Sequence, residues 1–289
     1  NLRCTAWRIS SEGEEIWSNT YGLDWCNAVI ELKNGQFLLS GRARRRALLV
    51  LIDGDGELIW RREYSSETYN HFTSMRETDG GVVVTGWTRP RPREDDTLGW
   101  CLKIDHEREG EIIWSRTYEF RPNQLCNSII SAPDGEFIIA GQTNNQLEDN
   151  DMIDFRSWWL LFRIDGEGEL QWSREYEMEN ARFSGKCKCI ERLRFDNNNL
   201  IVAGGGGDGG PNVGNVLRIN GNGQENWRRT YDVVEEFDIT RFCSVVEGRD
   251  GSIVIAGYGI ADDESLQNGC LLKYAREVFE PEFLRWSPL

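Results

Sequence analysis

Residues 168–176 read Gly-Glu-Leu-Gln-Trp-Ser-Arg-Glu-Tyr, and the spacing of glycine, tryptophan and tyrosine in this stretch decides the fold. The pattern places tryptophan four residues after glycine and tyrosine four residues after tryptophan, and it occurs five times. Its tryptophans are Trp17, Trp60, Trp114, Trp172 and Trp227. They are separated by 43, 54, 58 and 55 residues, an interval that is too long for leucine-rich or ankyrin repeats and fits a four-stranded propeller blade.

A second repeated element lies between successive tryptophans, a short apolar run that ends in glycine. Residues 82–86 read Val-Val-Val-Thr-Gly, and similar runs occupy residues 37–41, 137–141, 200–204 and 253–257. Successive residues of a strand point to opposite faces of the sheet, so a run of consecutive apolar residues indicates a strand that is covered on both faces. Asn-Gly or Asp-Gly precedes four of these runs, which is the strongest short signal for a hairpin.

Together these elements define a unit of four antiparallel strands. In the first full unit we expect strands at residues 27–32, 36–41, 47–53 and 58–64, labelled a to d in order. Six c strands accompany only five a–b pairs, so the sequence predicts an all-β propeller of six four-stranded blades, the first incomplete; five blades plus an extra hairpin is the alternative. We expect a single domain over residues 1–289, with blade units at about 1–21, 22–64, 65–118, 119–176, 177–231 and 232–289.

The repeats resemble bacterial and archaeal propeller proteins built from D-G-G-[FY]-[IV]-[IV]-A-G and K-[IL]-D-x-x-G-x-x-x-W units. They are also distantly similar to the tryptophan-docking repeats of quinoprotein dehydrogenases, the PQQ-like propellers. Members are typically exported or surface proteins, so the resemblance implies an extracellular or cell-surface location and no particular reaction. One copy departs from the pattern, because two extra residues stand between Asp105 and Gly110.

The charge of the chain argues against nucleic-acid binding, and its hydropathy argues against a membrane-spanning segment. The chain of 289 residues has 33 Lys+Arg and 48 Asp+Glu, a formal net charge of −15. Such a surface repels phosphate backbones, so we expect no nucleic-acid binding. The longest apolar run, residues 47–52, is far shorter than the roughly 20 residues of a membrane-spanning helix, so we expect no such segment.

Catalytic and metal-binding chemistry finds little support in the sequence. His71 and His106 are expected before a strand a and in a c–d turn, at opposite ends of the disc, where they cannot cooperate. Asp53 and Asp165 begin Gly-rich turns that could suggest a calcium site, but an ordinary hairpin turn accounts for these residues without a metal ion. The quinoprotein family uses adjacent cysteines, whereas Cys187 and Cys189 are not adjacent. We therefore predict no catalytic residue, no metal and no cofactor, with calcium as the open alternative.

The eight cysteines follow the repeat. Four lie 14 or 15 residues before the glycine of strand b and are assigned to one equivalent site on strand a: Cys26, Cys126, Cys189 and Cys243. Cys4, Cys101 and Cys270 lie on or just before strand c. Strands a and c of one blade are about 9.6 Å apart, beyond the roughly 4.4–6.8 Å of a disulfide. We expect mostly free, buried thiols, while the even count leaves disulfides open.

Binding residues are expected on the face of the b–c and d–a loops, which are long and variable. The loops there carry an arginine-rich sector: Arg42, Arg44, Arg45, Arg46, Arg89, Arg91 and Arg93. Farther round they carry an acidic sector: Glu148, Asp149, Asp151, Asp154, Asp262, Asp263 and Glu264. This polarity suits an anionic partner or a second copy of the chain. The competing interpretation is a solvated surface with arginine stacked on Trp87 or Trp100.

The sequence therefore favours a non-catalytic β-propeller scaffold that binds a protein or itself, exported or at the cell surface. The alternatives are a carbohydrate-active or quinone-linked enzyme and a glycan-binding lectin, each using the channel mouth. An enzyme would gather carboxylates or a metal in a polar pocket, whereas a scaffold would make its contacts through loops. The lectin is weakened because five of the twelve tryptophans stand at the packing position of the repeat.

Overall fold

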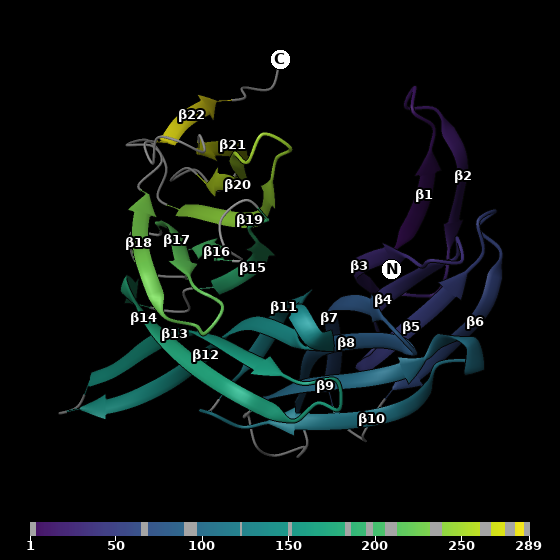
Figure 1. Ribbon diagram of the computed structural model, residues 1–289, viewed down its shortest axis with the longest axis horizontal. Helices are drawn as coiled ribbons and strands as arrows, with labels where there is room; N and C mark the ends of the chain where they lie inside the picture. Colours follow the sequence, from purple (N-terminus) through teal and green to yellow (C-terminus); the bar gives the residue numbers. More distant parts are fainter. Residues whose placement is uncertain are drawn as a thin grey trace. The chain divides into compact units, whose positions relative to one another are not determined.

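A computed structural model describes residues 4–64, 69–89, 97–121, 123–149, 152–182, 186–194, 199–205, 213–231, 239–260, 267–274 and 281–285. The chain forms two compact units. Unit 1 comprises residues 1–135 and 165–169, and unit 2 comprises residues 136–164 and 170–289. Nearly all of the described chain is β-strand, as the ribbons of Figure 1 show.

Unit 1 contains the strands of three sheets and the opening strand of a fourth. Their bounds are β1 (Thr5–Ile9), β2 (Glu15–Thr20), β3 (Trp25–Glu31), β4 (Phe37–Ala43), β5 (Arg46–Ile52), β6 (Leu58–Tyr64), β7 (Tyr69–Thr78), β8 (Gly81–Arg89), β9 (Leu98–Asp105), β10 (Glu111–Tyr118) and β11 (Leu125–Ser131). Two short 3₁₀ turns complete it, η1 (His106–Arg108) and η2 (Pro133–Gly135).

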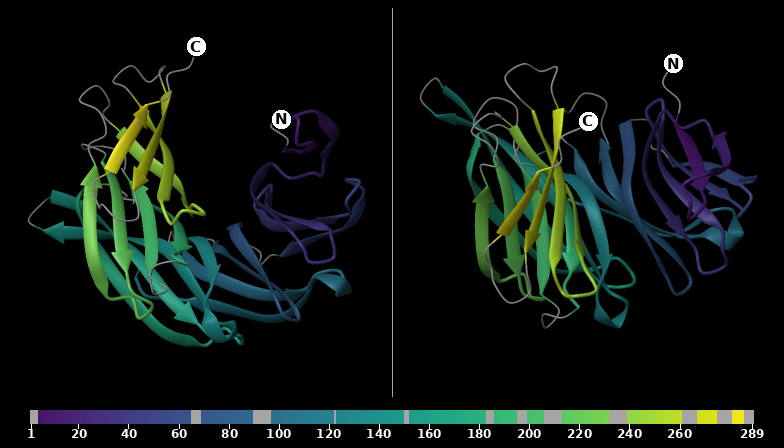
Figure 2. Two further views of the ribbon diagram at one scale, coloured as in Figure 1. Left: turned by 45° about the horizontal axis from the view of Figure 1, so that its top comes forward. Right: turned by 90° about the horizontal axis from the view of Figure 1, so that it is seen from above.

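Unit 2 contains the remaining strands. Their bounds are β12 (Phe137–Asp149), β13 (Met152–Ile164), β14 (Leu170–Arg182), β15 (Lys186–Arg192), β16 (Leu200–Gly205), β17 (Gly214–Ile219), β18 (Glu225–Tyr231), β19 (Ile239–Glu247), β20 (Ile253–Ile260), β21 (Gln267–Tyr274) and β22 (Pro281–Arg285). Figure 2 shows the strands of each sheet side by side in two further views.

The sheets follow the predicted units in order. β1 and β2 form a two-stranded sheet, and the rest of the described strands form five four-stranded sheets of consecutive strands, β3–β6 through β19–β22. Every pairing is antiparallel where the register is described. The expectation of six blade-like units with an incomplete first one is confirmed, and the strands of the first full unit begin and end within two residues of their predicted bounds.

The apolar runs of strands b and c are covered on both faces, as their composition predicts. All residues of β5 after Arg46 are buried, and so is the whole of β16. Within unit 1 the sheets β3–β6 and β7–β10 enclose one cluster, which includes Trp60, Phe72 and Trp100. Within unit 2 a second cluster lies around Phe242 and Tyr231. Within each unit, neighbouring sheets thus bury apolar residues in a shared cluster.

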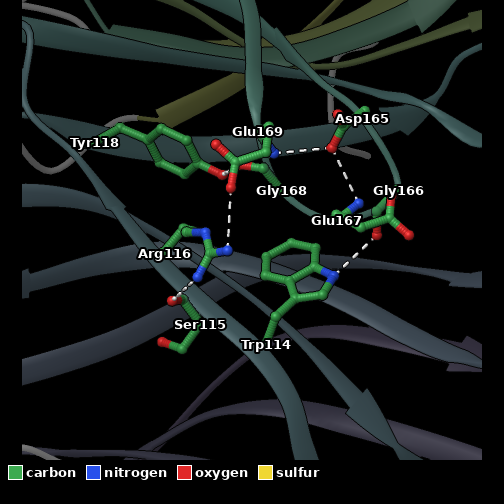
Figure 3. Close-up of polar contacts among 9 residues, drawn as sticks. All are labelled: Trp114, Ser115, Arg116, Tyr118, Asp165, Gly166, Glu167, Gly168 and Glu169. Carbon is green, nitrogen blue, oxygen red and sulfur yellow. Dashed lines mark hydrogen bonds and ion pairs between the residues drawn. The ribbon is translucent and has the colours of Figure 1, made fainter.

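At the junctions that the structure describes, the repeated tryptophan and tyrosine of one sheet pack against the c–d turn of the next sheet. Trp114 Nε1 donates a hydrogen bond of 2.9 Å to the carbonyl of Gly166, and the Tyr118 hydroxyl donates one of 2.7 Å to the carbonyl of Gly168 (Figure 3). A Cβ on Gly168 would lie 2.9 Å from the indole ring. The spacing of glycine, tryptophan and tyrosine within one repeat therefore serves contacts between two consecutive sheets. The aromatic residues of one strand d pack against the glycines of the following c–d turn.

The same bonds recur along the chain. Trp17 and Tyr21 donate to Gly54 and Gly56, Trp60 and Tyr64 donate to His106 and Gly110, and Tyr176 donates to Gly223. The Trp172 ring lies 2.9 Å from where a Cβ of Gly223 would be. Four of the five repeat tryptophans thus occupy a packing position between sheets. The turn that would receive Trp227, at residues 275–280, lies outside the described residues.

The acidic residues of the c–d turns hold the turn itself. One carboxylate oxygen of Asp53 accepts from the backbone N–H groups of Asp55 and Glu57, at 2.9 and 2.8 Å. Asn220 makes the same two bonds with its amide oxygen. Because an amide performs the task equally well, the shared requirement at this position is an oxygen acceptor, the chemistry of an Asx turn.

The turn with two extra residues keeps the same docking function. Its added length forms η1, capped by the Asp105 carboxylate, and Glu109 takes a left-handed φ of 50°. Gly110 still closes the turn with a 3.0 Å bond to the Asp105 carbonyl, and Trp60 donates to the His106 carbonyl instead of a glycine carbonyl. The insertion is therefore absorbed locally.

Candidate functional site

A bulge in strand a shapes the end of each sheet where the candidate site lies. The register shifts opposite the strand-b glycine in the four sheets whose a–b pairing is described. A Cβ on Gly41 or Gly86 would lie 1.9 Å from the carbonyl oxygen of Trp25 or His71, respectively. Only glycine fits there, and the bulge re-aims the residues at the start of strand a.

The bulges of β3 and β7 bring four planar side chains together at one end of unit 1. The Arg42 guanidinium lies over the ring of Trp25 at 5.3 Å and over the ring of Tyr69 at 5.0 Å. Tyr69 stacks on Trp87 at 5.2 Å with an interplanar angle of 7°. We call Trp25, Arg42, Tyr69 and Trp87 the ladder, since each group contacts the next.

The Trp25 end of the ladder is exposed to solvent, whereas the Arg42 guanidinium belongs to a partly buried residue. Trp25 is 51% exposed, whereas Arg42, Tyr69 and Trp87 are partly buried. The Arg42 Nε atom is buried and has no hydrogen-bond partner among the described residues. Two aromatic faces therefore hold a guanidinium in place by cation–π contact, and such a pre-oriented cation loses less freedom when it binds an anion.

His71 lies beside the ladder and is neutral near pH 7. Burial, with the positive charge of Arg42 as second cause, lowers the pKa of His71 to about 4. Its ring lies 5.5 Å from that of Trp87, and the Asn27 amide contacts its Nε2. The expectation that His71 precedes strand a is wrong by a small margin, because it is the third residue of β7. His106 lies in η1, on another turn of unit 1.

The predicted arginines fall into distinct environments. Arg44 has a positive φ of 56° and donates its backbone N–H to the Asp24 carboxylate, and its side chain is exposed. Arg46 pairs with Glu63 at 2.9 Å. Arg45 is exposed, and its carbonyl accepts from the Asn70 backbone at 2.9 Å.

The remaining predicted residues of this face are only partly described. Arg89 is partly buried and pairs in register with Tyr69, so it lies at the same end of the sheet as the ladder. Arg91 and Arg93 lie outside the described residues. The side chains of the predicted acidic sector, Glu148, Asp149, Asp151, Asp154, Asp262, Asp263 and Glu264, are likewise not described.

Sequence reasoning found Arg42 and missed its aromatic partners. The stacking expected on Trp87 or Trp100 occurs instead between Arg42, Trp25 and Tyr69. A signal was present, because the residue after each strand-b glycine pairs in register with the residue before the bulge: Arg42 with Trp25, and Trp87 with His71. Aligning the repeats at these two positions would have predicted that Trp25, Arg42, His71 and Trp87 lie at the same end of their sheets.

The described side chains provide a guanidinium group and aromatic rings at the ladder, and they form no metal site. Among the described residues, no group of three or more His, Cys, Asp or Glu side chains stands close enough to hold a metal ion. The two carboxylates nearest the exposed arginines, Asp24 and Glu63, are engaged by Arg44 and Arg46. The geometry suits recognition of a carboxylate group beside an apolar surface.

Comparison with known proteins shows the fold. No family model matches the chain, and no curated protein matches it. Among solved structures it is similar to Drosophila Plexin A in complex with Semaphorin 1b, at 8% identity and a TM-score of 0.52, over 98% of this chain and 74% of that one. The chain is a β-propeller.

Two further similar structures are more distant. The Dos1 propeller is 9% identical with a TM-score of 0.44, over 96% of this chain and 72% of that chain. The Bombyx mori GH32 β-fructofuranosidase is 11% identical with a TM-score of 0.42, over 88% and 63%. Both TM-scores lie below 0.5, so neither similarity carries an argument about this chain. In the described part of the chain there is no helix of the length and apolarity needed to cross a bilayer.

Proposed function

We propose that this protein is a non-catalytic propeller scaffold that binds an acidic protein segment at the ladder and its neighbouring arginines. The observation that carries the proposal is the Arg42 guanidinium held between Trp25 and Tyr69 at 5.3 and 5.0 Å. A planar, fixed guanidinium presents its free edge to a carboxylate in bidentate geometry. The exposed Trp25 ring adds an apolar surface on which the rest of the partner can pack.

The local charge supports an anionic partner. The exposed Arg44 and Arg45 side chains stand next to Arg42 in sequence, at the b–c turn. The chain as a whole carries a net charge of −15, so a basic surface on it is a local exception. Electrostatic complementarity of this kind contributes more to the choice of partner than to raw affinity.

The family resemblance supplies the rest of the proposal. It supports an exported or cell-surface location, and it assigns no cofactor. A second copy of this acidic chain is the alternative protein partner that the same arginines suit. A carbohydrate-active or quinone-linked enzyme and a glycan-binding lectin are the competing functions, and they predict binding that does not depend on the charge of the ligand.

The test is fluorescence anisotropy with a labelled octa-glutamate peptide at low salt, with octa-lysine and a neutral oligosaccharide as comparison ligands. We expect the glutamate peptide to bind and the Arg42→Ala and Arg45→Ala variants to weaken it, each by about threefold to tenfold. The matched control is Arg108→Ala, which removes an exposed arginine from the c–d turn of η1 and leaves the ladder intact.

Arg42→Lys separates stacking from charge. It keeps the positive charge but loses the planar group, so it should weaken binding nearly as much as Arg42→Ala. Equal loss of binding in Arg108→Ala, or stronger binding of the oligosaccharide than of the peptide, would contradict the proposal. Sedimentation of the protein alone reports self-association, which the same variants should reduce if the partner is a second copy.

A further inference from the structure

One close contact between consecutive sheets occurs at two junctions that the structure describes, one in each unit. On one side is a residue of strand c, four positions before the residue that pairs with the repeat tryptophan. On the other side is the residue of strand a in the next sheet that pairs with the strand-b glycine. At Gly99 a Cβ would lie 2.9 Å from the Cys126 sulfur, and at Gly214 it would lie 2.4 Å from the Phe242 ring. These positions are therefore neighbours in space, 27 and 28 residues apart in sequence.

The two sides of this contact complement each other in size. Gly99 faces Cys126 and Gly214 faces Phe242. Ala47 and Phe72, which stand at the same positions in the second and third sheets, share one buried cluster. A small residue on one side thus leaves room for a larger one on the other, as close packing between sheets requires.

At the junction of the first two sheets both sides are cysteine. Cys4 aligns with Gly99 through the pairing of Arg8 with Trp17, and Cys26 stands opposite Gly41. The Cys4 backbone N–H donates a 3.0 Å bond to the carbonyl of Leu23, three residues before Cys26. The two thiols are near enough to affect each other's ionisation, because Cys4 adds to the rise that burial gives the pKa of Cys26.

The repeated geometry fits a disulfide. In a disulfide the Cβ of one cysteine lies about 3 Å from the sulfur of the other, a distance fixed by the S–S bond and its angles. The 2.9 Å between a Cβ at Gly99 and the Cys126 sulfur is the same distance at the equivalent junction. The argument from strand spacing excludes a bridge between strands a and c of one sheet, and it does not apply between consecutive sheets.

We propose that Cys4 and Cys26 are a disulfide site that fastens the two-stranded first sheet, β1–β2, to the second sheet. Both cysteines are free thiols in the structure, and residue Cys26 is exposed and residue Cys4 partly exposed, so an oxidant reaches this pair more readily than the fully buried cysteines of the folded protein. A two-stranded sheet is marginal by itself and gains most from such a tie.

The sequence predicts mostly free, buried thiols; all eight cysteines are free in the structure, but only Cys101, Cys126 and Cys187 are buried, and Cys26 and Cys243 are exposed. The assignment of four cysteines to one site is also corrected. Cys187, rather than Cys189, stands opposite Gly204, and Cys243 is the bulged residue beside Phe242. Cys4 and Cys26 are therefore the one pair at this contact in which both members are cysteine, among the junctions described.

The reaction is thiol–disulfide exchange with a small disulfide such as oxidised glutathione. The thiolate of one cysteine attacks the glutathione disulfide, forms a mixed disulfide and releases one glutathione thiolate. The second cysteine, deprotonated, attacks the mixed disulfide, forms the Cys4–Cys26 bond and releases the second glutathione. Two protein thiols lose two electrons and two protons, and one oxidised glutathione gains them as two reduced ones.

The same chain contains a matched control pair. Cys101 and Cys126 are fully buried neighbours, and the Thr85 hydroxyl contacts the Cys101 sulfur at 3.2 Å. An oxidant cannot reach them without unfolding. They should stay reduced under conditions that oxidise Cys4 and Cys26.

The experiment treats the folded protein with oxidised glutathione, quenches with acid, alkylates free thiols and maps peptides by mass spectrometry. We expect a cross-linked peptide pair that contains Cys4 and Cys26, with Cys101 and Cys126 alkylated. Burial raises the pKa of both thiols, with Asp24 adding to the rise for Cys4 and the Cys4 thiol adding to it for Cys26, so the rate should increase from pH 7 to pH 9.

A second measurement tests the structural role. Oxidation should raise the Tm of the wild-type protein by roughly 5 °C. Cys4→Ser should abolish both the cross-link and this rise and leave Cys26 as a mixed disulfide with glutathione. Recovery of wild-type Cys4 and Cys26 as separate mixed disulfides, or a cross-link that forms only in denaturant, would overturn the proposal.

Discussion

At the scale of single residues, the glycines of the c–d turns differ in why glycine is required. Gly13 and Gly168 both have a left-handed φ, at +86° and +82°. A Cβ on Gly13 would meet nothing within 4 Å, whereas one on Gly168 would lie 2.9 Å from the Trp114 ring. The sequence repeat conceals this difference, because both positions carry the same residue in the same spacing.

Alanine at these two glycines separates backbone strain from packing. Gly13→Ala should lower the free energy of unfolding by about 1 kcal/mol, the cost of a left-handed backbone for a residue with a Cβ. Gly168→Ala should lower it by about 2–4 kcal/mol, since the methyl group also displaces the indole. Urea unfolding of both variants measures the difference, and equal losses would show that the Trp114 contact contributes nothing.

His71 gives the folded protein a sensitivity to mild acid. Its pKa is about 4 in the fold, against 6.5 as its ordinary value, so between these pH values the unfolded chain binds a proton that the folded chain does not. Stability therefore falls as the pH decreases from 6.5 toward 4. His71→Asn removes the titrating group, so its Tm should change less over pH 6.5–5. Parallel curves for both proteins would refute the assignment.

At the scale of the strand, the glycine that ends each strand-b run is explained by the bulge in strand a. A Cβ on Gly86 would lie 1.9 Å from the His71 carbonyl oxygen, and Gly41 has the same relation to Trp25. Backbone cannot move aside as a flexible side chain can. The bulge thus links the fold to the candidate site, because it places Trp25 and His71 at the end where the ladder forms.

Gly86→Ala tests this link. We expect a loss of about 2–4 kcal/mol in the free energy of unfolding, since either the β7–β8 register or the bulge must change. Gly54→Ala is the control, because its Cβ would meet its nearest neighbour at an ordinary 3.7 Å. A near-neutral Gly86→Ala would mean that the sheet accommodates the methyl group without the bulge.

The strand pattern could be predicted because it depends on local spacing. Periodicity and turn residues gave the four strands of a unit within two residues of their observed bounds, for example β6 at Leu58–Tyr64. The bulge could not be predicted in this way. It depends on the distance between Gly41 and a carbonyl of a different strand, and no single stretch of sequence carries that information.

The candidate site was predictable only in part for the same reason. The arginines of residues 42–46 are visible as a charge cluster, but the rings that hold Arg42 come from β3 and from β7 of the following sheet. The Cys4–Cys26 contact likewise joins two sheets. Side-chain chemistry can be read from a strand, whereas its partner in the next sheet depends on register and stacking.

At the scale of the whole molecule, charge acts against the proposed binding at long range and for it at short range. The net charge of −15 repels an acidic segment at a distance, while Arg42 of the ladder and the neighbouring Arg44 and Arg45 attract it on contact. The Debye length is about 30 Å at 10 mM salt and about 10 Å at 0.1 M. Added salt therefore screens the long-range repulsion before it weakens contacts at hydrogen-bond distance.

The association rate of an acidic peptide should accordingly increase as salt rises from 10 to 100 mM, while its dissociation rate also increases. Stopped-flow anisotropy with octa-glutamate measures both rates. Replacing the exposed Glu107 and Glu167 by glutamine removes two negative charges from c–d turns of unit 1, so it should reduce the increase in association rate. A rate that falls steadily from the lowest salt would mean that the arginine cluster dominates the field, contrary to this account of the molecule.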